Sequence, residues 1–182
     1  FSHSNMSGAI VKNANLSSGI FISAIMDHID FTETTIGNPN FSGASMLESN
    51  MCGQNLTESI LTNVDFGNSN MKDVDLTNQS GLIGTSFNGA NLSGSKMEQT
   101  NLSGVTFISS ILDHIDFSET NIGVVNFSGA SMINVNMCGQ NIRDTFITNV
   151  NFEGSNLKEI DLTNQSGLIG TSFNETVLTE AI

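Results

Sequence analysis

The chain has 182 residues, a formal net charge of −13, only five Lys and Arg residues together, and no Trp or Tyr. Its length suits one domain or two small ones. So few basic residues exclude direct nucleic-acid binding through the phosphate backbone. Because no run of about 18 apolar residues is present, we expect no membrane insertion. The 12 Phe and eight Met residues argue against disorder, because disordered chains contain few large apolar residues.

Large apolar residues recur every five positions, a period that fits neither a helix nor a strand. The residue two before each of them is mostly small, and the residue between the two is often Asn or Asp. Residues two apart point to the same side of an extended chain, so the small and the large residue both point inward. Ser, Thr or Gly often follow, and these residues favour turns. Each five residues therefore predict one short extended side and one corner.

Two segments show this pattern clearly: Ala14–Ser18 reads Ala-Asn-Leu-Ser-Ser, and Ala90–Gly94 reads Ala-Asn-Leu-Ser-Gly. Over essentially its whole length the chain resembles the pentapeptide-repeat family, whose pattern is A-(D/N)-L-x-x. The resemblance implies an all-β fold, a right-handed four-sided β-helix with four pentapeptides per coil. About 8.5–9 coils at a spacing of about 4.8 Å would make a rod of roughly 40–43 Å. The expected core includes Phe21, Phe41, Phe107, Phe127, Leu16 and Leu102.

The chain also repeats itself at an offset of 86 residues, since Asp75–Ser86 recurs unchanged as Asp161–Ser172. An internal duplication is the simplest account. We therefore predict a single domain over residues 1–182, with a first copy at 1–86, a second copy at 87–172 and a partial third at 173–182. Phe1 is already a core position and only four residues follow Leu178. Because solenoids normally carry terminal caps, we expect a fragment of a longer chain, or ends that stack on other copies.

The five-residue spacing breaks at Gln79–Gly84 and again at Gln165–Gly170. In one interpretation Leu82 and Leu168 are ordinary core residues and one extra residue bulges nearby, so each copy has 17 sides. In the other, all six residues loop out at a corner, so each copy has 16 sides and equivalent residues stack on one face. The loop interpretation places like residues over like residues, which packs without voids. We therefore favour extruded loops, although these leave Leu82 and Leu168 near the surface.

No nucleophile, base and orienting group can be assembled from the three His and two Cys residues. We therefore expect a non-enzymatic protein with no catalytic residue, no metal site and no cofactor. The candidate interaction surface has an acidic and an apolar part. Its residues are Asp27, Asp30, Glu33, Asp113, Asp116 and Glu119, with Leu82, Ile83, Leu168 and Ile169 at the two breaks.

Several apolar residues stand in outward positions where Asn or Asp is usual. They are Ile10, Ile20, Ile25, Ile60, Ile111 and Phe146. Scattered apolar residues on a surface need no explanation. If they align on one face with the Leu82–Ile83 segment, they form a patch suited to a partner.

Two functions fit these observations. The first is a scaffold or protein–protein interaction module with an unidentified protein partner and end-to-end or dimeric self-association, as one domain of a larger bacterial protein or effector. The second follows from the resemblance alone, because the family includes proteins that mimic DNA and bind type II topoisomerases such as DNA gyrase. A duplex carries about 25 charges over this length, roughly twice the net −13 found here. This favours the scaffold, in the bacterial cytoplasm or as a secreted effector.

Overall fold

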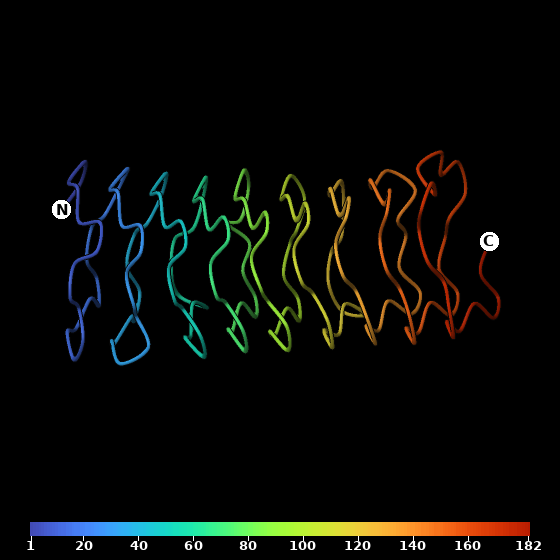
Figure 1. The fold of residues 1–182 in the computed structure, drawn as a ribbon, viewed down its shortest axis with the longest axis horizontal. Helices are drawn as coiled ribbons and strands as arrows, with labels where there is room; N and C mark the ends of the chain where they lie inside the picture. Colours follow the sequence, from blue (N-terminus) through green and yellow to red (C-terminus); the bar gives the residue numbers. More distant parts are fainter.

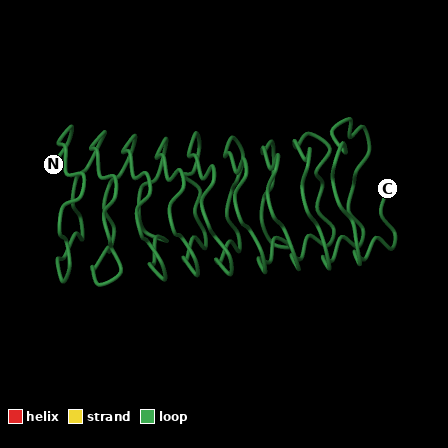
Figure 2. Ribbon diagram, in the orientation of Figure 1, coloured by secondary structure: helices red, strands yellow, loops and turns green.

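The computed structural model describes residues 1–182. The chain winds into a β-helix in which each coil lies beside the one before it, and the two termini lie at opposite ends of the rod (Figure 1). It contains no helix and no strand longer than one bridged residue, so the ribbon is drawn as loop and turn throughout (Figure 2). Isolated parallel bridges hold successive coils together.

Each coil has four sides of five residues. We name them sides 1 to 4 after their large inward residues at the start of the chain: Phe1, Met6, Val11 and Leu16. Most bridges join residues 20 positions apart, as in Asn15 and Thr35. At this bridge the Leu16 N–H donates to the Thr35 carbonyl at 2.8 Å, and the Thr35 N–H donates to the Ala14 carbonyl at 3.0 Å. The bridged residue is the outward one of each side, between the small and the large inward residues.

Most corners are closed by a hydrogen bond within the chain and a residue in the left-handed region. The Ala14 N–H donates to the Val11 carbonyl at 2.8 Å, and Asn13 between them has a φ of 61°. Gly, Asn, Asp and Ser at this second corner position reach positive φ more readily than branched residues. His28 and His114 occupy it as well, with φ of 58° and 63°. They are therefore corner residues, and both are exposed.

The interior is a continuous stack of large apolar side chains. Phe66, Phe87, Phe107 and Phe127 stack face to face with ring centroids 5.2–5.5 Å apart. Of the other expected core residues, Phe21, Phe41 and Leu102 are buried, and Leu16 is partly buried against the core.

The two breaks are one-residue bulges, so the expectation of extruded six-residue loops is wrong. Across the first break the bridge spacing rises only from 20 to 21, as in Asp65 and Ser86, and the second break shows the same at Asn151 and Ser172. Leu82 is fully buried. Extruding six residues would have exposed this leucine, whereas one extra residue keeps it buried and lets the ladder resume at Asp65 and Ser86. The physical cause is therefore the burial of Leu82.

The bulge also changes which residues stack. The loop interpretation placed Phe87 above Leu61, whereas the structure stacks Phe87 on Phe66 with ring centroids 5.3 Å apart. Each 86-residue segment therefore comprises 17 sides rather than 16. Residues that are equivalent between the two copies lie on neighbouring sides of the rod.

The backbone ladder opens at three places in each copy, where both hydrogen bonds between neighbouring coils are missing. We call these places ladder gaps. They lie between Ile10 and Asp30, Thr35 and Asn55, Ile60 and Gly81, and, 86 residues later, between Lys96 and Asp116, Asn121 and Asn141, and Phe146 and Gly167.

Bulky inward residues accompany the ladder gaps. Ile29 and Gln54 precede the first two, in an inward position that is usually small. The Gln54 amide turns inward and donates to the Phe31 carbonyl at 2.7 Å, as expected for an enclosed amide. At the third gap the Gln79 amide donates to the Ser59 carbonyl at 2.9 Å. Ile160 is an exception, because it stands in the same kind of position beside an intact bridge.

Candidate functional site

The two neighbouring sides 1 and 2 form a nearly uncharged surface. We define the neutral strip as the outward residues of sides 1 and 2 and the corner residues between these sides, from Ile20 to Phe146. Its charged members are Asp65, Arg143 and Asp144, so from Ile20 to Asn126 a single carboxylate interrupts it. For a chain with a net charge of −13, this is a long surface with little charge.

Apolar side chains protrude from this strip. Ile60 is 48% exposed and Phe146 is 58% exposed. Further exposed apolar residues of the strip are Ile20, Ile25, Ile83 and Val124. The alignment of outward apolar residues considered from the sequence is therefore found for four of the six, while Ile10 and Ile111 lie on side 3.

Most acidic residues lie on the other half of the rod. Side 3 and its following corner carry Asp30, Glu33, Asp73, Asp113, Glu153 and Glu175, and side 4 and its corner carry Glu58, Asp75, Glu98, Asp116, Glu119, Glu159 and Glu180. Four of the five basic residues lie there too, and three of them pair with an acid on the adjacent coil. Lys12 contacts Glu33 at 2.9 Å, Lys96 contacts Asp75 at 3.6 Å, and Lys158 contacts Glu180 at 3.5 Å. The rod thus has a neutral half and an acidic half.

Two of the predicted acidic surface residues hold neighbouring coils together. Asp27 accepts from the Ser45 hydroxyl at 2.6 Å and from the Leu47 N–H at 3.0 Å. Asp113 repeats this contact in the second copy, with Ser131 at 2.7 Å and the Ile133 N–H at 3.0 Å. Both aspartates are half-buried. Their carboxylates therefore satisfy a corner of the next coil, a role that the sequence does not reveal because the partners lie 18–20 residues away.

The remaining predicted acids are exposed. Asp30 accepts from the N–H and the hydroxyl of Thr32, at 3.0 and 2.8 Å. The first of these hydrogen bonds contributes most to lowering the Asp30 pKa. At Asp116, burial acts to raise the pKa, but hydrogen bonds from Ser118 and Asn136 outweigh it and leave the pKa lowered. Both aspartates are therefore ionised at neutral pH.

The acidic clusters of the two copies are displaced from one another by one side of the rod. Asp30 lies on side 3 and its equivalent Asp116 lies on side 4, because of the bulge between them. Glu33 and Glu119 lie at the corners that follow these two sides.

The apolar residues at the breaks also separate into two kinds. Leu82 is buried, so its assignment to an interaction surface is wrong. Leu168 is 40% exposed, whereas Ile83 and Ile169 are 60% and 76% exposed. Ile83 lies within the neutral strip.

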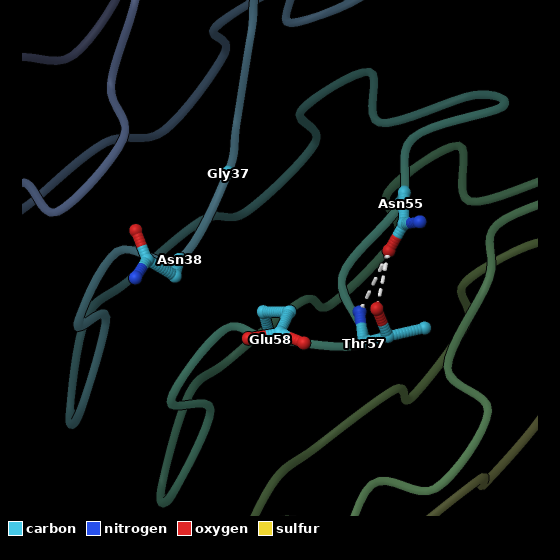
Figure 3. Close-up of a pocket in the computed structure, with 5 residues that line it drawn as sticks. All are labelled: Gly37, Asn38, Asn55, Thr57 and Glu58. Carbon is cyan, nitrogen blue, oxygen red and sulfur yellow. Dashed lines mark hydrogen bonds between the residues drawn. The ribbon is translucent and has the colours of Figure 1, made fainter.

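Most recesses in the surface coincide with ladder gaps. The gap between Thr35 and Asn55 opens into a recess of about 330 Å³ lined by Gly37, Asn38, Asn55, Thr57 and Glu58 (Figure 3). In it the Asn55 side chain accepts two hydrogen bonds from Thr57. The equivalent gap of the second copy opens into a recess of about 280 Å³ that includes Gly123 and Asn141. These shallow polar recesses contain no nucleophile paired with a base.

Groups that could carry other chemistry are dispersed. His28 lies 3.5 Å from the Glu48 carboxylate at the surface, and Cys52 and Cys138 are free thiols. No group of three or more His, Cys, Asp or Glu side chains is arranged to hold a metal ion. The structure also contains no helix that could span a membrane.

Comparisons with known proteins agree with this fold. A profile described as pentapeptide repeats (8 copies) matches residues 40–78, and one described as a pentapeptide repeat region matches residues 80–162. No curated protein sequence matches the chain.

Several solved structures are similar to the chain. HetL, a pentapeptide repeat protein involved in heterocyst differentiation regulation in Nostoc sp. strain PCC 7120, is 16% identical over 100% of this chain and 87% of its own, with a TM-score of 0.40. QnrB1, a plasmid-mediated fluoroquinolone resistance protein, is 14% identical over 98% and 81%, with a TM-score of 0.37. Rfr23 from the cyanobacterium Cyanothece 51142 is 18% identical over 90% of each chain, with a TM-score of 0.24.

Proposed function

Because the chain belongs to the pentapeptide-repeat family, we propose that it is a non-enzymatic scaffold that binds a protein partner along the neutral strip. The observation that carries this proposal is the separation of a nearly uncharged, isoleucine-bearing half from an acidic half. Apolar groups that are grouped on one surface favour partner binding, because burying them releases water. The acidic half then keeps the rod soluble and discourages contact through its other sides.

The rod comprises about nine coils, since a coil takes 20 residues and each bulge adds one. It arose by duplication of an 86-residue unit, since the bulges and the ladder gaps recur at that interval. We place its site of action in the bacterial cytoplasm, with delivery as a secreted effector as the alternative, and fractionation of the source cell tests this.

The test of the scaffold uses full-length protein and a matched pair of variants. Ile60→Asp places a charge in the neutral strip, and Ile10→Asp places the same charge on side 3, where Ile10 is 94% exposed. We expect Ile60→Asp to abolish co-purification of partners from the source cell and Ile10→Asp to leave it unchanged. Equal binding by the two variants would show that the partner does not contact the strip.

A second candidate is a DNA mimic that binds a type II topoisomerase through sides 3 and 4. The observation that favours it is the gathering of acidic residues on these two neighbouring sides. The net charge of −13 over roughly 40 Å is nevertheless about half that of a duplex, which carries one charge per about 1.7 Å. A supercoiling assay with DNA gyrase tests this candidate. Absence of inhibition at micromolar protein would exclude DNA mimicry.

A further inference from the structure

We infer that the partner of the neutral strip is a second copy of this chain, bound side by side and antiparallel, strip against strip. This inference rests on the proposed function and names the occupant of the same surface. It concerns the flank of the rod, and the ends of the rod take no part in it.

Charge favours the strip over every other surface for self-association. Two chains that each carry a net charge of −13 repel one another, and this repulsion is strongest where acidic residues meet at short distance. Sides 3 and 4 carry most of the carboxylates, whereas the strip has only Asp65 between Ile20 and Asn126. Two copies therefore approach with least repulsion through their strips.

The available area is sufficient. The whole chain exposes 8060 Å², so a contact through one quarter of the rod's circumference would cover about 2,000 Å² per copy, against the roughly 800 Å² per partner of a standard interface. The dimer therefore needs less than half of the strip in close contact.

The spacing of outward side chains along the strip is the same in both copies. Outward side chains follow one another at the coil spacing of about 4.8 Å along each rod. The side chains of a second rod with the same spacing therefore stay aligned with those of the first over the whole length. The side chains of a partner with a different repeat lose this alignment after a few coils. A two-fold antiparallel contact is also closed, so it ends at a dimer.

The outward residues of side 2 fix the alignment. This side carries two large exposed apolar residues, Ile25 near one end and Phe146 near the other. Placing Ile25 of each copy opposite Phe146 of the other buries both pairs at once. The same alignment places Asp65 opposite Thr106, since each lies two coils further toward the middle of the rod. No two carboxylates of side 2 meet.

The experiment measures mass in solution, by sedimentation or by light scattering, for the full chain from about 1 to 100 µM. We expect twice the monomer mass of 19.4 kDa. Phe146→Asp should weaken the dimer at least tenfold, since a charge then enters a desolvated apolar contact. Ile10→Asp on side 3 is the matched control and should leave dimerisation unchanged. Raising the salt concentration should strengthen the dimer, because it screens the repulsion between the acidic halves.

A cross-link tests the alignment directly. In a background with Cys52→Ser and Cys138→Ser, the double variant Ile25→Cys with Phe146→Cys should form a covalent dimer under mild oxidation. The double variant Ile10→Cys with Phe146→Cys should not. Within one copy Ile25 and Phe146 lie six coils apart, at roughly 29 Å, so they cannot form a disulfide with each other.

The outcomes separate this inference from the proposed function. A monomer at the highest concentration, or a dimer that survives Phe146→Asp, would overturn the inference. If the chain is monomeric and strip variants no longer bind a different purified partner, the scaffold function is supported and the homodimer is refuted. If the homodimer forms and no other partner requires the strip, the strip serves self-association alone. Circular dichroism of each variant shows whether the fold is intact.

Discussion

Replacing Leu82 by Ala tests the bulge, on which the whole register of the second copy depends. The Leu82 side chain is fully buried, whereas its neighbour Ile83 is 60% exposed. Removing a buried leucine side chain down to Ala costs about 2–5 kcal/mol, because apolar burial is lost and a cavity remains. We therefore expect Leu82→Ala to lower the free energy of unfolding by about 3 kcal/mol. Ile83→Ala is the matched control and should cost less than about 0.5 kcal/mol.

Leu168→Ala provides an intermediate comparison in the same experiment. It occupies the equivalent position in the second copy, but it is 40% exposed. Leu168→Ala should therefore cost less than Leu82→Ala and more than Ile83→Ala. The cost should lie near 1–2 kcal/mol if it scales with the buried fraction.

Urea unfolding followed by far-UV circular dichroism measures these differences. The chain has no Trp or Tyr, so intrinsic fluorescence offers little signal. Neighbouring coils stabilise one another in a solenoid, so the midpoint and the slope should be compared together. If Leu82→Ala is no more destabilising than Ile83→Ala, Leu82 lies outside the core. The extruded loop would then be correct, and the stacking of Phe87 on Phe66 would be wrong.

Three further predictions use the same measurement. Phe107→Ala removes the middle of a phenylalanine stack and should cost about 3–5 kcal/mol; a cost below about 1 kcal/mol would contradict close packing there. Asp113→Ala should cost about 1–3 kcal/mol, because it leaves the Ile133 N–H without its acceptor, and an unchanged midpoint would argue against this contact. The pKa values of Asp30 and Asp116 are lowered from their usual 3.8. Their stabilisation is therefore complete above about pH 4 and is lost as the pH falls through the lowered values. A pH series should show a lower unfolding midpoint in acid, and stability rising toward pH 2 would contradict it.

The sequence predicted the family and the β-helix because the five-residue period is present in almost every coil. It did not predict the register at the breaks, and the reason lies in the core itself. The loop interpretation preferred a column that runs Phe21, Phe41, Leu61 and Phe87, because similar residues then lie over one another. The structure stacks Phe66 over Met46 and then Phe87 over Phe66. Because Met and Phe both fill the interior, both registers offered plausible columns.

The candidate surface was only partly predictable for a related reason. The outward isoleucines are visible in the sequence, but which of them share a surface depends on a register that changes by one side at Leu82. The Asp27 and Asp113 contacts join neighbouring coils, and no local pattern marks them. The ladder gaps accompany single bulky residues such as Gln54, whose effect on the backbone appears only once the coils are stacked.

Because of the bulge, the two copies are related by a screw rotation. A residue of the second copy lies about 20 Å further along the axis than its equivalent in the first copy and a quarter of the circumference away. A flat partner with two identical binding sites therefore cannot contact both copies in the same way. A long flexible partner can do so if it winds around the rod at the same pitch, and binding two sites at once then raises its overall affinity. Only after four such copies would the original side return.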